Sequence, residues 1–246
     1  MTDTIAAQSS VLPVPQSLPA RVLGVLTSPR AAYAGIAARP RWFGALALVI
    51  LVSVACTTTF LSTDVGKEAL LDQQTRRAEA FSGHPMTDAQ YAQVQKMLPY
   101  SPYVAAGGQI VALPLIALLV SAVSFAVFTA MLGGAGTFKQ TFAVVAHSGM
   151  VLAVSQLFMT PLNYARETMT SATSLGVFAP FLDEGSFLAR VLGSIDLFIL
   201  WWAISLAIGL GVLYKKRTGP IATSIIVVYV AIGVIIAAFK AAVAGA

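Results

Sequence analysis

The sequence predicts an all-α fold: a polytopic membrane helical bundle with five transmembrane helices, short interfacial N-terminal helices and a helical outer loop. Of the 246 residues, 57% are hydrophobic and only 10% are charged, with a mean hydropathy of +0.81. A soluble domain carries about 25% charged residues. In addition, five segments each supply the roughly 20 apolar residues needed to cross a bilayer. This composition excludes an ordinary soluble enzyme, a disordered chain and a nucleic-acid-binding protein.

The segment before the first span divides into two parts. Residues 1–17 are polar, contain two prolines and predict a flexible cytosolic tail. Within residues 18–38, Ser28 followed by Pro29 is typical of a helix start. We therefore expect two short, weakly amphipathic helices, edged by arginine, that lie along a membrane face. The sequence leaves open whether they are an ordered lead-in to the first span or a partner-docking surface.

A membrane domain is predicted over residues 18–240, with a short C-terminal end at 241–246. The outer loop 62–103 follows the first span, and Thr87 with Gln90 three residues later forms a capping box that opens a helix within it. None of the five spans contains Lys or Arg. The predicted spans are residues 42–61, 104–132, 141–162, 191–214 and 220–239.

Basic residues in the short turns set the predicted orientation. Lys139 lies between the second and third spans, and the run 215–217 (Lys-Lys-Arg) lies between the fourth and fifth. Short basic loops stay in the cytosol, so the N-terminus is predicted to be cytosolic and the C-terminus outside. The glycine-rich segment 133–136 lacks the Gly-Lys-Ser/Thr ending of a phosphate loop. We predict instead that it ends one helix and turns into the next.

Two ionisable residues fall inside the predicted spans, His147 and Asp196, and such residues are functional candidates by default. At a rise of 1.5 Å per residue, His147 lies nearer the inner face and Asp196 nearer the outer face. A direct pair is therefore not expected, and Asp196 is predicted to be hydrogen-bonded in a polar layer beneath the outer face. The residues expected near the depth of Asp196 are Gln109, Gln156, Thr57 and Thr58, and those expected near His147 are Ser124, Ser205 and Tyr229.

These polar residues have two interpretations, of which the sequence favours the first. They are either interhelical hydrogen bonds that stabilise packing, worth about 0.6 kcal/mol each, or a proton or solute site that opens outward at Asp196. No catalytic, metal-binding or cofactor-binding residue is predicted, since Cys56 is the single cysteine and the spans contain no His-Glu-x-x-His pattern. The candidate intramembrane polar site comprises Asp196, Gln109, Gln156 and His147.

Three motifs in order along the chain suggest a family. They are the run 28–42 (SPRAAYAGIAARPRW) before the first span, 133–138 (GGAGTF) between the second and third, and 195–201 (IDLFILW) at the start of the fourth. Over residues 18–240 the chain resembles the Yip (Ypt-interacting protein) domain family in its short bacterial form. The resemblance implies a five-helix domain of a bacterial inner membrane with a cytosolic N-terminus and no established activity. Eukaryotic relatives bind Rab-type GTPases, but that role is not carried over because the N-terminal segment here is only about forty residues long.

The resulting hypothesis is a non-enzymatic, multi-pass membrane protein of the Yip type that organises the membrane or binds a partner. The alternative is a small transporter or permease subunit with an ion or solute site at the polar layer around Asp196. A water-filled cavity reaching Asp196 favours the transporter, a dry, packed bundle favours a scaffold, and a lipid-binding groove is a third outcome. The expected partners are the lipid bilayer, other membrane proteins or a second copy of the chain, but not nucleic acid.

Overall fold

The structure, a computed structural model, describes residues 17–183 and 186–244. Within these residues there is no strand, apart from an isolated bridge between Ser174 and Asp196. The predicted tail 1–17 lies outside the described residues except for Ser17, whose hydroxyl caps α1. The α-helices are α1 (Leu18–Thr27), α2 (Pro29–Ala38), α3 (Phe43–Leu61), α4 (Asp64–Ser82), α5 (Asp88–Met97), α6 (Ser101–Phe125), α7 (Phe138–Ser148), α8 (Met150–Ala165), α9 (Phe187–Ser194), α10 (Leu197–Tyr214) and α11 (Thr218–Ala244).

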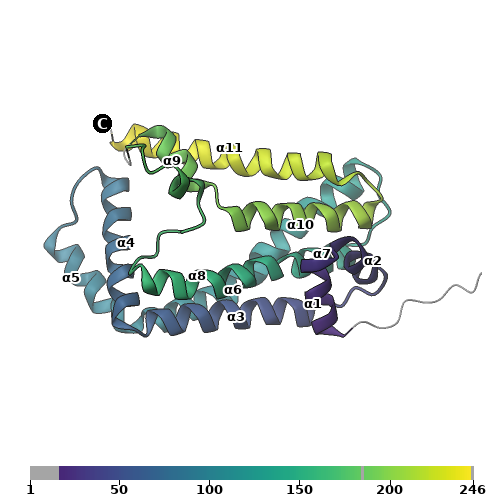
Figure 1. Ribbon diagram of the computed structural model, residues 1–246, viewed down its shortest axis with the longest axis horizontal. Helices are drawn as coiled ribbons and strands as arrows, with labels where there is room; N and C mark the ends of the chain where they lie inside the picture. Colours follow the sequence, from purple (N-terminus) through teal and green to yellow (C-terminus); the bar gives the residue numbers. More distant parts are fainter. Residues whose placement is uncertain (1–16, 184–185, 245–246) are drawn as a thin grey trace, which may run out of the picture.

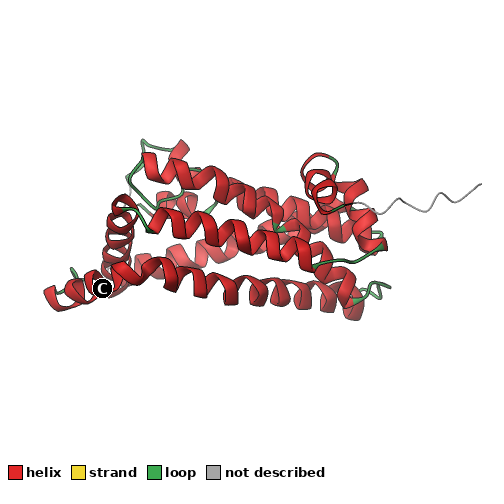
Figure 2. Ribbon diagram, turned by 90° about the horizontal axis from the view of Figure 1, so that it is seen from below, coloured by secondary structure: helices red, strands yellow, loops and turns green. Residues whose placement is uncertain are grey.

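Five stretches of the described chain are long and apolar enough to cross a membrane, so the predicted all-α bundle with five membrane-spanning helices is confirmed. They contain α3, α6, the α7–α8 pair, α10 and α11, and they run along the long axis of the molecule (Figures 1 and 2). The helices α1 and α2 lie at one end of this bundle, and α4 and α5 lie at the other (Figure 1). We call these the α1–α2 end and the α4–α5 end.

Two predicted spans differ from the observed helices. The third begins at Phe138 and is divided at Gly149 into α7 and α8. The fourth was expected to begin at Val191, but α9 ends at Ser194 and α10 begins only at Leu197. Asp196 between them is extended (φ −106°, ψ 134°). The expectation that Asp196 lies five residues inside a span is therefore wrong, because its carboxylate caps the start of α10.

Helix α2 packs into the bundle itself, which the sequence did not indicate. Tyr33 and Ile36 of α2 are fully buried, and the hydroxyl groups of Tyr33 and Ser205 of α10 are hydrogen-bonded at 2.8 Å. A Cβ at Gly209, one turn further along α10, would lie 3.0 Å from the Tyr33 ring and 2.5 Å from a methyl of Val144. The small residues of α10 thus form a groove that receives α2 as part of the core.

The glycine-rich turn also has a packing role. Tyr214, the last residue of α10, stacks on Phe128 with ring centroids 4.9 Å apart, and its hydroxyl is 2.7 Å from that of Thr141. A Cβ at Gly134 or Gly136 would lie 2.6 or 2.7 Å from the Tyr214 ring. The predicted helix end and turn is confirmed, and both glycines are needed because the aromatic ring occupies the space of a side chain.

The close packing of α10 against α2 and α7 at Gly209 generates a stability prediction. Gly209→Ala should lower the free energy of unfolding by about 1–3 kcal/mol, because the new methyl group overlaps the buried side chain of Val144. Gly108→Ala is the matched control, since a Cβ at that position of α6 meets nothing within 4 Å. It should leave stability unchanged or raise it by up to about 1 kcal/mol. Denaturant titration in detergent micelles measures both, and equal effects would contradict this packing.

Candidate functional site

Asp196 is the centre of a saturated network of hydrogen bonds. One carboxylate oxygen, Oδ1, accepts from the backbone N–H groups of Phe198 at 2.8 Å and Ile199 at 3.4 Å. The other, Oδ2, accepts from the hydroxyl of Thr173 at 2.8 Å and from that of Ser171. All four donors belong to the protein, so the carboxylate joins the loop after α8 to the start of α10.

The backbone around Asp196 extends this network. The Tyr229 hydroxyl on α11 accepts from the Asp196 N–H at 3.0 Å and donates to the Ser194 carbonyl at 2.8 Å. The Leu197 N–H donates to the Thr173 carbonyl at 3.0 Å. Tyr229, which was expected near His147, is therefore part of the Asp196 network.

The two predicted glutamines do not contact Asp196. The Gln109 amide nitrogen donates to the Thr57 hydroxyl at 2.8 Å, while its Oε1 is buried without a hydrogen-bond partner. Both residues line a cavity of about 370 Å³ at the α4–α5 end, together with apolar residues of α3 to α6. Gln156 is half-buried on α8. In the described part of the chain, no hydrogen bond joins any two of Asp196, Gln109, Gln156 and His147.

His147 is fully buried in α7. Its Nδ1 lies 2.7 Å from the Ala143 carbonyl one turn earlier, so Nδ1 carries the donated proton and Nε2 is left buried without a partner. The next residue, Ser148, accepts a hydrogen bond from the Trp202 indole at 3.1 Å. The Trp202–Ser148 bond joins α10 to α7, whereas the His147 bond stays within α7 and does not link His147 to the Asp196 network.

Sequence reasoning missed a cluster of arginines at the α1–α2 end. Arg21 of α1 is only 5% exposed, Arg39 is half-buried and Arg41 is exposed. Burial, and then the charges of Arg41 and Arg39, lower the pKa of Arg21 from its ordinary value, although arginine stays protonated in proteins. The only signal in the sequence was that this segment carries arginines and no acid.

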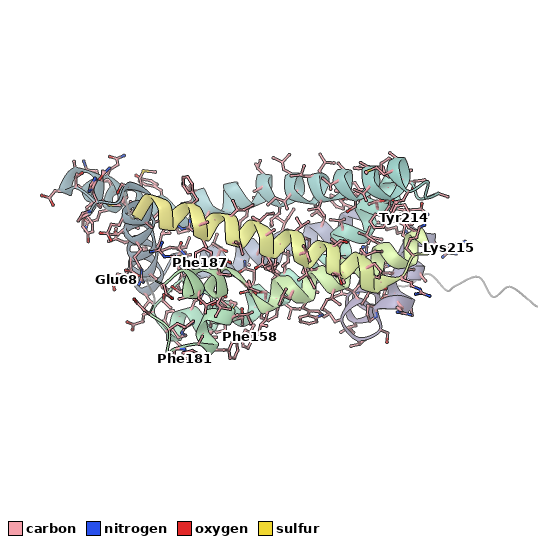
Figure 3. All side chains as sticks on the ribbon, turned by 90° about the horizontal axis from the view of Figure 1, so that it is seen from above. Glu68, Phe158, Phe181, Phe187, Tyr214 and Lys215 are labelled. Carbon is pink, nitrogen blue, oxygen red and sulfur yellow. The ribbon has the colours of Figure 1, made fainter. Side chains whose placement is uncertain are left out.

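The acidic residues gather at one end of the bundle, where α4 and α5 also carry basic residues. Every acidic residue that the structure describes belongs to residues 64–88, to residues 167–183 or to position 196, which lie toward the α4–α5 end (Figure 1). In Figure 3, Glu68 lies at that end and Lys215 lies at the opposite one. Among the described residues, no group of three or more His, Cys, Asp or Glu could hold a metal ion.

The five apolar stretches and their packing define the class, a polytopic α-helical membrane protein. The family model of the Yip1 domain matches residues 23–239, so the chain belongs to the Yip1 domain family. The match includes α2, the glycine-rich turn and Asp196, and therefore the motifs on which the resemblance was based. Neither a search of curated proteins nor a search of solved structures found a match.

The Asp196 network predicts different effects for two substitutions. Asp196→Ala removes the helix cap and leaves two hydroxyl groups without their acceptor, which should destabilise the protein by about 1–3 kcal/mol. Asp196→Asn is the control, because asparagine caps helices as well as aspartate does. Hydrogen exchange in residues 171–175 should become faster in the alanine variant and change little in the asparagine variant. Unchanged exchange in both would contradict a structural role.

Proposed function

We propose that this chain is a non-enzymatic Yip-type protein of a bacterial inner membrane, which binds a partner on the cytosolic side through its α1–α2 end. The observation that carries the proposal is the burial of α2 against α10. Because Tyr33 and Ile36 are fully buried, the two N-terminal helices are held in one position. A surface that is fixed before binding loses little conformational entropy on association.

The charge of this end indicates the kind of partner. Exposed basic residues surround the fixed helices, and no described residue at this end is acidic. Such a potential attracts a protein with an acidic surface and raises the rate of encounter. The same asymmetry supports a cytosolic location for this end, since basic loops stay inside. The exposed basic residues are Arg30, Arg41, Lys139, Lys215, Lys216 and Arg217.

The alternative, a transporter with a site at Asp196, gains no support from the geometry. The carboxylate already accepts four hydrogen bonds from the protein, so an ion or solute would have to displace structural donors. The other candidate residues, Gln109, Gln156 and His147, are not linked to it. The network supports instead a role in holding the outer loops and the helix starts together.

The proposed orientation is testable with single cysteines. In a Cys56→Ser background, Thr27→Cys on α1 and Gln93→Cys on α5 each place a thiol at an exposed position, one at each end of the bundle. A membrane-impermeant maleimide added to spheroplasts should label Gln93→Cys directly. It should label Thr27→Cys only after the membrane is permeabilised. The reverse pattern would show that the α1–α2 end faces outward and would overturn the proposal.

Partner binding is testable by site-specific photocrosslinking in cells. A photoreactive amino acid at Thr27 should give one discrete protein adduct, and the Lys215→Glu, Lys216→Glu double variant should reduce its yield several-fold by reversing charge beside the docking face. Lys96→Glu is the control, because Lys96 is exposed on α5 at the other end. An adduct that survives the double variant, or is lost equally with Lys96→Glu, would contradict a charge-guided partner at this end.

A further inference from the structure

Three arginines come together where α1 meets the start of α3. Leu18, in the first turn of α1, lies against Gly44 of α3, since a Cβ built on that glycine would be 3.3 Å from the leucine side chain. Arg21 follows Leu18 by one turn. The Arg41 N–H donates to the Arg39 carbonyl at 2.9 Å, in the short link between α2 and α3. The three guanidinium groups thus come from α1, the end of α2 and the entrance to α3.

This cluster has no counter-charge in the described protein. Among the described residues, the ion pairs join Lys67 to Asp64 and Arg76 to Asp72, and all four of these residues are on α4 at the other end of the bundle. The Arg21 guanidinium makes neither an ion pair nor a hydrogen bond within the described residues, although the residue is 5% exposed. Buried charges in proteins are normally paired. An arginine that is buried beside two others therefore indicates an anion that the described residues do not provide.

The surroundings of the cluster indicate what the anion is attached to. Phe43 directly follows Trp42 at the start of α3 and is 71% exposed, and Leu23 of α1 is 62% exposed. Phe43 is two residues after Arg41, at the point where a membrane span begins, whereas Leu23 lies on the opposite side of α1 from Arg21. A phospholipid matches both the arginines and the exposed apolar surface. A guanidinium group binds two phosphate oxygens at once, and the acyl chains would cover the exposed apolar side chains.

We infer that Arg21, Arg39 and Arg41 form a binding site for the phosphate of an anionic phospholipid, in the leaflet next to α1. The acyl chains of this lipid run along Phe43 and α3. A folded protein with an acidic surface does not fit as well, because it cannot reach a residue as buried as Arg21. This site shares Arg41 with the exposed basic residues proposed above for partner binding, but it does not depend on that proposal.

Native mass spectrometry of the full chain tests the site. The protein is released from mixed micelles of phosphatidylglycerol and phosphatidylcholine, and the ratio of the two lipids that stay bound is measured. The unaltered chain should retain phosphatidylglycerol preferentially. Arg21→Gln and Arg41→Gln should each lower this preference about fivefold, the effect expected for one basic residue near an anionic lipid. Arg41 is exposed, so its variant gives a result even where Arg21→Gln fails to fold.

Arg30→Gln is the matched control, because it removes the same charge from an exposed position of α2 outside the cluster. It should leave the lipid ratio unchanged. A drop as large as that of Arg41→Gln, or no preference for phosphatidylglycerol in the unaltered chain, would overturn the site. Millimolar inorganic phosphate added to the micelles separates the two sources of the anion. Retention of the lipid supports a phospholipid, whereas its displacement would show that free phosphate is the ligand and overturn the lipid assignment.

Discussion

The packing of α2 into the groove of α10 is the contact on which the rest of the molecule depends. Tyr33 fits there because Gly209 has no side chain, and its hydroxyl is bonded to Ser205 inside the bundle. The same helix contacts α7, where the Gln140 amide donates to the Ala37 carbonyl at 2.9 Å. Helices α2, α7 and α10, which are far apart in the sequence, are thereby held together at the α1–α2 end of the bundle. As a result, the N-terminal helices form part of the membrane domain, and their arginines have fixed positions.

The two ends of the bundle use polar groups differently. At the α4–α5 end, the Asp196 carboxylate accepts hydrogen bonds from four donors. Such bonds lower the free-energy cost of placing a charged group near hydrocarbon. At the α1–α2 end, cations collect without described acids. In the first arrangement, the protein supplies the hydrogen-bond donors for its own carboxylate, and these bonds stabilise the loops. The second has no acidic residue beside it among the described residues, and this is the basis for both the proposed partner and the inferred lipid.

Much of the fold follows from the sequence because length and hydropathy are local properties. The approximate spans, the capping box at Thr87 and the glycine-rich turn were all predictable. The start of α10 was not, because hydropathy averaged over twenty residues does not register one extended residue at Asp196. The burial of α2 was not predictable either, since a weakly amphipathic helix suits an interface as well as a groove. Its position depends on Gly209 and Ser205 of α10, which are remote in the sequence.

Hydrogen exchange of the α2 backbone, in the full chain embedded in lipid nanodiscs, tests the central claim most directly. A helix buried against α10 opens only when the bundle opens. The amides of residues 32–36 should therefore exchange as slowly as those in the middle of α10, and far more slowly than those of α5, which has no buried residue. Exchange of residues 32–36 as fast as that of α5 would show that α2 lies loosely on the surface, and would contradict this account of the fold.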